Sequence, residues 1–270
     1  KISNILLKFG IDVRRKLFKE VHENLGGELE MIICGGAFLD SKYEQGLYDL
    51  GIHVVNGYGI TECSPVVTCN RLDDFRFGSA GKALECNEIR INNPDEEGIG
   101  EVYVRGTNVM MGYYDEPEAT ADAFDDGWFK SGDYGRLDED GELYITGRKK
   151  FIIILPNGEN IFPETVESNI MEHLPYAVET VAFEEKIITA TGKEAMVMSA
   201  AIYVNKEFLK DMSEEEIITK TKADVAESNK GQPSYRKVQN VYVSFNEFEK
   251  NSTRKVIRQK VIDTYTAKTV

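Results

Sequence analysis

The order of two short apolar runs around one helical segment is the feature that most constrains how residues 29–62 can fold. The runs "LEMII" and "IHVV" are continuous and of strand length, and the residues between them have helical periodicity over positions 41–50. Strand, helix and strand in this order predict a βαβ unit with a parallel sheet. Since the carboxyl ends of parallel strands meet at one edge of a sheet, we expect the glycine-bearing segments 34–37 and 56–62 to emerge there together.

The apolar pattern changes in the middle of the chain. Short runs ("NEIRI", "GEVYVRG", "ELYIT") alternate between polar and apolar residues and are separated by turn sequences such as Asp-Gly, which predicts a small antiparallel sheet or barrel. A third pattern begins near Phe151, with the strand "FIIIL", a helix opened by Pro163, a helix capped by Ser213 and a basic tail. The predicted fold class is α/β plus α+β, divided into part of a parallel α/β subdomain (residues 1–70), a small antiparallel β-barrel-like subdomain (71–147) and a separate small α+β domain (148–270).

The first helix is predicted over residues 11–25. Its apolar residues recur every four positions, so they would share one helical face, and the Gly26-Gly27 pair would end the helix. The residues of this face are Val13, Leu17, Val21 and Leu25.

Charge and cysteine content limit the partners and the compartment. The formal net charge of the 270 residues is -14, so nucleic acid and anionic lipid surfaces repel the chain as a whole, and a polyanionic ligand must meet a local basic cluster. The four cysteines form no CxxC motif, which favours free thiols in a reducing, cytoplasmic setting over metal binding or disulfides. No apolar run approaches the roughly 18 residues of a membrane span, and the opening residues lack the pattern of a secretory signal.

Residues at the two predicted strand ends suit a nucleotide. At the first strand end, small residues let the backbone approach a flat ligand, although such a group more often only makes a tight turn. They are Gly35, Gly36 and Ala37. At the second strand end, Asn56 offers a carboxamide that can pair with an amino group on a ring. Tyr58 adds an aromatic face between two permissive glycines, Gly57 and Gly59.

Hydroxyl, carboxylate and basic side chains follow in positions that suit phosphates, a cation and ribose. Thr61 could donate to a phosphate oxygen and Glu62 could bind Mg²⁺, unless the pair only starts a helix. Asp133 could accept hydrogen bonds from two adjacent ribose hydroxyls, although Gly-Asp is more often a turn. Arg148 and Lys150 could meet phosphate, or form a solvated basic patch.

Six motifs in order carry a resemblance to a known family. They are "GGA", "NGYGITE", "NVMMGYYDEPEAT", "GWFKSGD", "LYITGRKKFIIILPNGENIFPETVE" and "NSTRKVIRQK". Their order and wording resemble the adenylate-forming (AMP-binding) ligase superfamily, and within it bacterial long-chain fatty acyl-CoA synthetases, over residues 29–258. The resemblance implies an acid-thiol ligase with two steps. A carboxylate attacks ATP to give an acyl-adenylate and pyrophosphate, and the thiol of coenzyme A then displaces AMP.

The resemblance implies how the adenosine would be held. Adenine would lie between Tyr58 and the backbone of residues 35–37, and Asn56 would contact its amino group. Asp133 would hold the ribose hydroxyls, and Arg148 would contact the ribose or a phosphate.

Further roles implied by the resemblance concern the phosphates and the second step. Thr61 would bind the α-phosphate, Glu62 would bind Mg²⁺, and Lys255 would steady negative charge on the reacting carboxylate and α-phosphate, which makes these three the implied catalytic residues. Lys150 would lie at the hinge about which the C-terminal domain rotates as a lid. Gly158 would line the pantetheine tunnel for coenzyme A, with an ordinary hairpin turn as the alternative.

Two departures from the family pattern matter. Arg254 stands where the family has Gly before the catalytic lysine. The sequence also lacks the Ser/Thr/Gly-rich loop with a lysine that cradles the β- and γ-phosphates of ATP in this family, and most of the fatty acid pocket. With the missing initiator Met, these absences predict that the chain is about the C-terminal half of such an enzyme and is inactive alone.

Two other interpretations stay open at this point. The parent could be a different adenylate-forming enzyme, either an aryl-CoA ligase or the adenylation domain of a peptide synthetase, or the chain could be a non-catalytic nucleotide-binding module. The favoured interpretation implies small-molecule partners, namely fatty acid, ATP with Mg²⁺ and coenzyme A, and no nucleic acid. A fatty acid substrate is compatible with loose association of the whole enzyme with a membrane surface. The sequence does not determine the acyl chain length or the oligomeric state.

Overall fold

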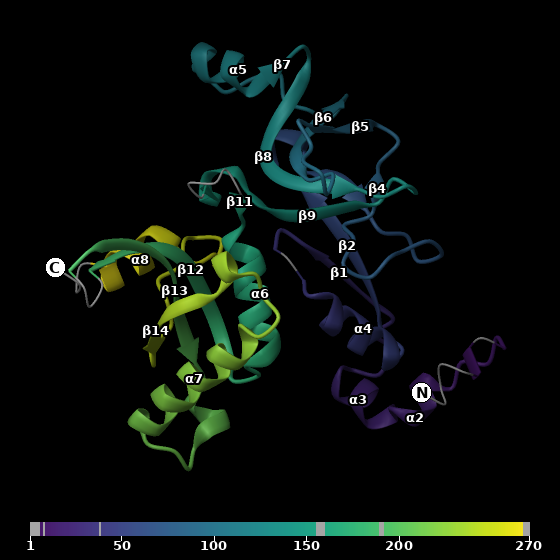
Figure 1. Cartoon of the computed structure of the whole chain (residues 1–270). Coiled ribbons are helices and arrows are strands. Elements are labelled where there is room, and N and C mark those ends of the chain that lie inside the picture. Colours follow the sequence, from purple (N-terminus) through teal and green to yellow (C-terminus); the bar gives the residue numbers. More distant parts are fainter. Residues whose placement is uncertain (1–5, 8, 38, 155–159, 189–191, 267–270) are drawn as a thin grey trace. The chain divides into compact units, whose positions relative to one another are not determined.

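The computed structural model describes residues 6–7, 9–37, 39–154, 160–188 and 192–266. The chain forms two compact units, Lys1–Lys149 and Lys150–Val270. We call them unit 1 and unit 2 (Figure 1).

Residues 14–24 of unit 1 form two short helices, α2 (Arg14–Leu17) and α3 (Lys19–Asn24), instead of the single predicted helix. Gly26 and Gly27 follow α3 with φ values of +90° and +82°. The predicted end of the helical region at this glycine pair is therefore confirmed, because only glycine adopts this conformation without strain.

The apolar face predicted for this region is wrong, since polar side chains are the buried ones. Arg14 and His22 are buried, whereas the exposed residues include Leu17, Val21 and Leu25. Arg14 Nη1 donates to the carbonyl oxygen of Tyr48 at 2.6 Å, and His22 Nε2 lies 2.8 Å from the carbonyl oxygen of Leu50. Specific hydrogen bonds to the end of the next helix thus orient α2 and α3, and their apolar residues face outward.

The first sheet of unit 1 contains the predicted βαβ unit. Strands β1 (Met31–Gly35) and β2 (His53–Gly59) pair in parallel, and helix α4 (Ser41–Asp49) joins them. In their register Cys34 lies opposite Asn56 and Gly35 opposite Gly57, so the two glycine-bearing segments do emerge side by side. Strands β3 (Val66–Cys69) and β4 (Lys82–Ala83) continue the sheet with antiparallel pairing.

Residues 56–59 continue strand β2, whereas we expected them to follow the end of this strand. Strand β3 runs antiparallel beside them, and its pairing shifts between Tyr58 and Gly59. A Cβ atom on Gly59 would lie only 2.2 Å from the carbonyl oxygen of Pro65. This glycine therefore allows close approach of two strand segments, which is the other common reason for glycine in a strand.

The second sheet of unit 1 is antiparallel, as the alternating runs predicted. Its order is β5-β6-β8-β7, with β9 also paired to β8, and all of these pairs are antiparallel. The strands are β5 (Asn87–Asn92), β6 (Gly100–Gly106), β7 (Phe124–Asp125), β8 (Trp128–Leu137) and β9 (Leu143–Arg148), and helix α5 (Pro117–Ala123) precedes β7. Strand β8 curves strongly (Figure 1), and Gly132 within it has a φ of +70°.

Unit 2 is an α+β fold around a three-stranded sheet of order β12-β13-β14. Its elements are β10 (Ile153–Ile154), β11 (Asn160–Ile161), α6 (Pro163–His173), β12 (Ala177–Ile188), β13 (Glu194–Val204), α7 (Glu214–Ser228), β14 (Val238–Ser244) and α8 (Arg258–Thr266). One prediction needs correction here. In the part of "FIIIL" that the structure describes, the strand covers only Ile153–Ile154, after a 3₁₀ turn at Lys149–Phe151. The basic tail leads into α8, which begins at Arg258.

Helices cover both faces of the unit 2 sheet. One core contains Val166 and Ile170 of α6 with Ile217 and Val225 of α7, packed on residues of β13. The other contains Val261 of α8 with Phe183 and further residues of the sheet. Pro163 is at the first position of α6, and Ser213 with Glu216 forms a capping box at α7, so both predicted helix starts are confirmed.

The cysteines are free thiols, as predicted, and all lie in unit 1. Cys63 is fully buried, and this burial raises the pKa of its thiol to about 11. In the parts of the chain that the structure describes, no helix combines the length and the apolar character needed to cross a bilayer.

Candidate functional site

Three of the predicted site residues meet in unit 1. The Tyr58 hydroxyl donates a hydrogen bond to Asp133 Oδ2 at 2.7 Å, and Arg148 Nε lies 3.0 Å from Asp133 Oδ1. Asp133 and Arg148 are direct partners in the register of β8 and β9, while Tyr58 comes from β2 of the other sheet. The Asp133 side chain is only 4% exposed, so these contacts hold an almost fully desolvated carboxylate in one position.

The chemistry of this group follows from its surroundings. Burial raises the pKa of Tyr58 well above its ordinary value, and the nearby Asp133 carboxylate raises it further, so the phenol stays protonated and remains a donor. The Ser131 hydroxyl accepts a hydrogen bond from the Asp133 backbone N–H and donates to the carbonyl oxygen of Val102 at 2.6 Å, which fixes the backbone around Gly132. A carboxylate has about four lone-pair sites, so two held oxygens can still accept hydroxyl donors.

The residues predicted to approach adenine lie at the ends of β1 and β2. Gly35, Gly36 and Ala37 are exposed at the end of β1, and Gly36 has a φ of +79° with open space where a Cβ would stand. Asn56 is buried on β2 opposite Cys34. The Tyr58 ring packs at the edge of an apolar core that includes Cys63 and Val102. Their roles toward adenine stay predictions.

Thr61 and Glu62 lie in a 3₁₀ turn, η1 (Thr61–Cys63), directly after β2. Thr61 is exposed, and Glu62 Oε1 accepts a hydrogen bond from the Tyr113 hydroxyl at 3.1 Å. Asn108 Nδ2 donates to the carbonyl oxygen of Cys63 at 2.7 Å. The sequence analysis did not identify Asn108 and Tyr113 as supports of this turn, although both stand in the motif "NVMMGYY". A motif alone does not tell which other segment of the chain it contacts.

Glu62 can contribute to a magnesium site but cannot form one alone. In the described ranges of the chain, no three His, Cys, Asp or Glu side chains gather as metal ligands. A single carboxylate beside a nucleotide still fits Mg²⁺, which is commonly bound by one or two carboxylates together with substrate phosphates and waters. The second oxygen of Glu62 would be the protein ligand.

The other predicted residues belong to unit 2. Lys150 is exposed in the 3₁₀ turn Lys149–Phe151, with its Nζ 4.8 Å from the centre of the Phe151 ring. Lys255 is exposed at the end of a turn in which Asn251 Oδ1 accepts hydrogen bonds from the backbone N–H groups of Thr253 and Lys255. No carboxylate of the described residues pairs with either lysine Nζ. Gly158 lies outside the described residues, and the placement of the two lysines relative to Asp133 stays a prediction.

Arg254 occupies a conformation that glycine prefers. Its φ is +61°, in the left-handed region, and its N–H donates to the carbonyl oxygen of Asn251 at 3.0 Å. A non-glycine residue there costs about 1–2 kcal/mol. The departure from the family pattern at this position is therefore a source of backbone strain next to Lys255.

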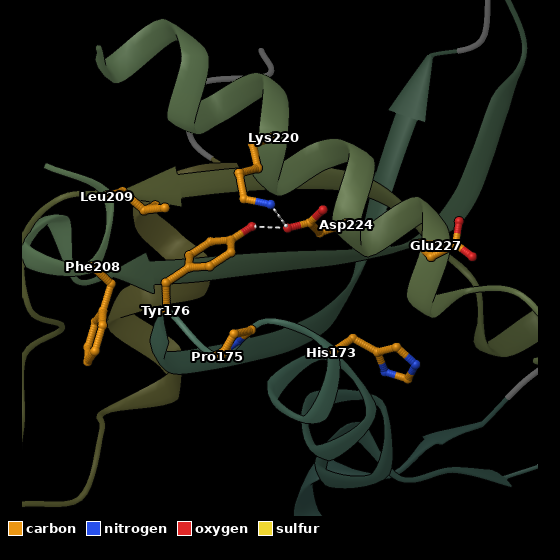
Figure 2. Close-up of a pocket in the computed structure, with 8 residues that line it drawn as sticks. All are labelled: His173, Pro175, Tyr176, Phe208, Leu209, Lys220, Asp224 and Glu227. Carbon is orange, nitrogen blue, oxygen red and sulfur yellow. Dashed lines mark hydrogen bonds and ion pairs between the residues drawn. The ribbon is translucent and has the colours of Figure 1, made fainter. Parts of the chain in front are cut away.

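Figure 2 shows a separate pocket of unit 2, about 500 Å³ in volume, that contains none of the predicted residues. It is lined by His173, Pro175, Tyr176, Phe208, Leu209, Lys220, Asp224 and Glu227. Asp224 Oδ2 accepts hydrogen bonds from the Tyr176 hydroxyl at 2.6 Å and from Lys220 Nζ at 2.8 Å. Because Asp224 and Lys220 already neutralise each other's charge, we assign this pocket no part in the proposed reaction.

Two family models match the chain, one within each of its two units. Residues 5–114 match the family described as "AMP-binding enzyme", and residues 150–269 match the "AMP-binding enzyme C-terminal domain". The chain belongs to the AMP-binding enzymes.

Curated proteins similar to this AMP-binding enzyme include several long-chain-fatty-acid–CoA ligases. The ligase FadD15 of Mycobacterium bovis is 38% identical over 159 residues, which cover 59% of this chain and 26% of that protein. Long-chain-fatty-acid–CoA ligase 1 of Homo sapiens is 37% identical over 171 residues (60% and 24%), and a feruloyl-CoA synthase of Amycolatopsis is 39% identical over 149 residues (53% and 30%). The chain thus spans about a quarter of the length of these relatives.

Solved structures resemble this AMP-binding enzyme over most of its length. O-succinylbenzoate coenzyme A synthetase from Bacillus subtilis, in complex with ATP and magnesium ion, has a TM-score of 0.68 at 25% identity and covers 97% of this chain and 54% of its own. ATP-bound MatB from Rhodopseudomonas palustris has a TM-score of 0.69 at 26% identity (89% and 46%). The anthranilate CoA ligase AuaEII has a TM-score of 0.71 at 22% identity (88% and 45%), a likeness of fold alone.

Proposed function

We propose that this chain provides nucleotide-binding and catalytic residues of an ATP-dependent fatty acyl-CoA ligase. The enzyme would join a fatty acid carboxylate to AMP with release of pyrophosphate, and the thiol of coenzyme A would then displace AMP. The observation that carries the proposal is the buried Asp133 carboxylate, held by Tyr58 and Arg148 in unit 1. A fixed acidic residue of this kind suits the two adjacent hydroxyls of ribose. The similarity to long-chain-fatty-acid–CoA ligases supports the choice of substrate.

In this proposal unit 1 binds the nucleotide. Asp133 accepts hydrogen bonds from the ribose hydroxyls, and Arg148 adds positive charge beside them. The exposed backbone of residues 35–37 and the segment around Tyr58 contact adenine. Each of these groups orients the adenosine, so the α-phosphate is presented toward the turn that follows β2.

The phosphates and the acyl group would meet the remaining residues. The Thr61 hydroxyl donates to an α-phosphate oxygen, and Glu62 provides a ligand for Mg²⁺, which when bound neutralises phosphate charge. Lys255, free of any acidic partner among the described residues, delivers a positive charge to the reacting carboxylate and α-phosphate. Loss of one such donor typically raises the barrier by about 3 kcal/mol. Lys150 would act as the hinge, and Gly158 would border the coenzyme A channel.

We further propose that the chain alone binds adenosine phosphates but does not turn ATP over. Its sequence has no Ser/Thr/Gly-rich loop with a lysine for the β- and γ-phosphates. Binding of AMP needs only the groups of unit 1, whereas activation of a carboxylate needs the pyrophosphate to be held and released. Reducing intracellular conditions suit the free thiols, and we keep the cytoplasm as the proposed location.

Calorimetric titration of the chain with AMP tests the binding claim. We expect measurable binding, and we expect Asp133→Asn to weaken it about tenfold or more because the ribose hydroxyls lose a charged acceptor. The control is Asp122→Asn, which changes an exposed aspartate of helix α5. Equal affinity in the wild type and Asp133→Asn would contradict the assigned ribose site.

Pyrophosphate exchange into ATP, driven by palmitate, benzoate or amino acids, tests the activity claim. We expect no exchange with this chain, and exchange with palmitate when the same residues are present in a protein of the relatives' full length. Rapid ATP turnover by the chain alone would contradict the need for the phosphate loop. Preference for benzoate would favour a second candidate function, that of an aryl-CoA ligase. The 39% identity to a feruloyl-CoA synthase is the observation that favours this candidate.

A further inference from the structure

One arginine of unit 2 connects the segment that follows Lys150 with the turn that carries Lys255. Arg258 is the first residue of helix α8, three positions after Lys255. Its guanidinium carbon lies 4.9 Å from the centre of the Phe151 ring, and the Nζ of Lys150 lies 4.8 Å from the same ring centre. These distances are within the range of cation–π attraction. The contact therefore places the start of α8 directly on the residue next to the proposed hinge.

The same guanidinium is fixed by an ion pair with helix α6. Arg258 Nη1 lies 2.7 Å from Glu167 Oε1, and Arg258 Nη2 donates to the carbonyl oxygen of Ala182 at 2.8 Å. Glu167 Oε1 also accepts from the Ala182 N–H at 2.7 Å. The side chains of Arg258 and Glu167 are only 13% and 14% exposed, so the pair is shielded from water. Such a pair holds its two side chains in one arrangement.

Ala182 belongs to β12, which is an edge strand of the three-stranded sheet. The Arg258–Glu167 pair binds both the N–H and the C=O of this residue, so it caps the outer side of the strand at that point. Helix α6, strand β12, helix α8 and Phe151 thus share one contact group. Only a planar guanidinium can pair with the carboxylate, donate to the carbonyl and lie against an aromatic ring at once.

The first arm of the Lys255 turn is held separately on the same strand. Lys250 Nζ lies 2.5 Å from Glu179 Oε1, and the N–H of Phe248 donates to Glu179 Oε2 at 3.1 Å. Lys250 and Val256 form an antiparallel bridge across the base of the turn. Arg258 fixes the second arm, so β12 anchors the turn on both sides.

We propose that Arg258 is a positioning residue that, through Glu167 and Phe151, holds the Lys255 turn in a fixed place relative to the Lys150 segment. The importance of Lys255 rests on the proposed function, whereas the contacts themselves do not. A residue that links these two segments would keep the lysine charge in register with the hinge as unit 2 moves. The backbone strain at Arg254 increases the need for such an anchor, because a strained turn relaxes when its ends are released.

The energetics of the pair favour a positioning role over a stabilising one. Burial raises the pKa of the Glu167 carboxyl to about 7, although the Arg258 guanidinium lowers it, and Glu164 of the same helix raises it further. The cost of desolvating the carboxylate therefore exceeds what the pairing returns. Buried ion pairs of this kind contribute little net stability but are strongly restrictive in geometry.

Hydrogen–deuterium exchange on the whole chain, read by mass spectrometry, tests the inference. The variants are Arg258→Met, Glu167→Gln and Arg258→Lys. The control is Lys186→Met, which removes a lysine of β12 from an exposed ion pair with Glu194 of β13. We expect Arg258→Met to speed exchange on the order of tenfold in two segments together, residues 150–154 and 251–257. Glu167→Gln should act in the same direction, and Arg258→Lys should restore part of the protection because it can pair but cannot also bind Ala182 and Phe151.

Helix α7 is the internal reference for this experiment, since it lies in unit 2 while the hydrogen bonds and ion pair of Arg258 and Glu167 go to other elements. Unchanged exchange in residues 251–257, or an equal increase in α7, would overturn the inference, because the effect would then be absent or global. Calorimetry with AMP on the same wild-type sample separates the two proposals. Failure to bind AMP with the expected exchange pattern would refute the function and leave the positioning role intact.

Discussion

At the scale of single residues, the contact between Asp133 and Tyr58 joins the two sheets of unit 1. It pairs a phenol at the end of a parallel strand with a carboxylate from an antiparallel sheet 75 positions along the chain. The hydrogen bond is charge-assisted and shielded, which makes it stronger than an exposed one. Asp133, the residue proposed to bind the ribose, therefore also holds the structure of unit 1 together.

Replacement of Asp133 by asparagine should lower the free energy of unfolding of unit 1 by about 1–3 kcal/mol, since Tyr58 loses a charged acceptor in a buried place. Urea unfolding followed by the fluorescence of Trp128 measures this, because it is the only tryptophan of the chain and stands in β8, the strand that carries Asp133. Arg148→Gln is the matched control. That side chain is about half exposed, so its loss should cost at most about 1 kcal/mol. A larger loss from Arg148→Gln than from Asp133→Asn would refute this order.

Replacement of Arg254 by glycine should raise the free energy of unfolding of unit 2 by up to about 1 kcal/mol, because glycine adopts a φ of +61° without strain. Urea unfolding followed by circular dichroism gives the change. Arg254→Asn should give an intermediate gain, since asparagine tolerates this region, and Arg254→Ala should give none. A gain from alanine equal to that from glycine would point to the arginine charge instead of the backbone.

At the scale of helices and strands, part of the fold could be predicted from the sequence and part could not. The βαβ unit and the capped start of α7 were predictable, because strand length, order and cap residues are local signals. The apolar face predicted for helix 11–25 was wrong, since the buried residues are Arg14 and His22, which find carbonyl partners on another element. No local pattern encodes such partners. The same limit applies to the site: sequence singled out Tyr58 and Asp133 but not the hydrogen bond between them.

The stability of unit 2 should depend on pH through Glu167, which joins helix α6 to β12 and α8. The pKa of Glu167 is raised from about 4.5 to about 7, so the folded state holds its proton more tightly than the unfolded state does. The contribution of this group to stability is fully present below about pH 4.5 and is lost as the pH rises through about 7. Exchange rates of the α6 amides at pH values across that range, compared with Glu167→Gln, measure the effect. The glutamine variant should lack this dependence; the same fall in both proteins would assign it to another group.

At the scale of the whole molecule, the most unusual feature of unit 1 is the number of its exposed apolar side chains. Leu17, Val21 and Leu25 of the α2–α3 region are exposed, and so are Met31 and Ile33 of strand β1. Parallel strands are usually covered on both faces. Where exposed apolar residues gather in a patch, they mark either a contact surface or a tendency to self-associate.

The triple change of Leu17, Val21 and Leu25 to lysine should reduce self-association of the chain and its binding of a hydrophobic dye. The free energy of unfolding should change by no more than about 0.5 kcal/mol, because these side chains are exposed. Sedimentation and dye fluorescence measure the two effects. The control is Glu20→Lys with Glu23→Lys, which alters charge in the same helix without removing apolar surface. An equal effect of the control would attribute the association to charge.

The burial of Cys63 provides a way to measure how often the proposed nucleotide site opens. The thiol sits next to Glu62 in the turn Thr61–Cys63, fully covered and with a pKa of about 11, so an alkylating reagent reaches it only when the turn opens. The rate at which the Cys63 thiol is modified therefore reports how often the turn that carries Thr61 and Glu62, the proposed phosphate and magnesium ligands, opens. A nucleotide that holds this turn closed would lower the rate of modification, even where no ATP is consumed.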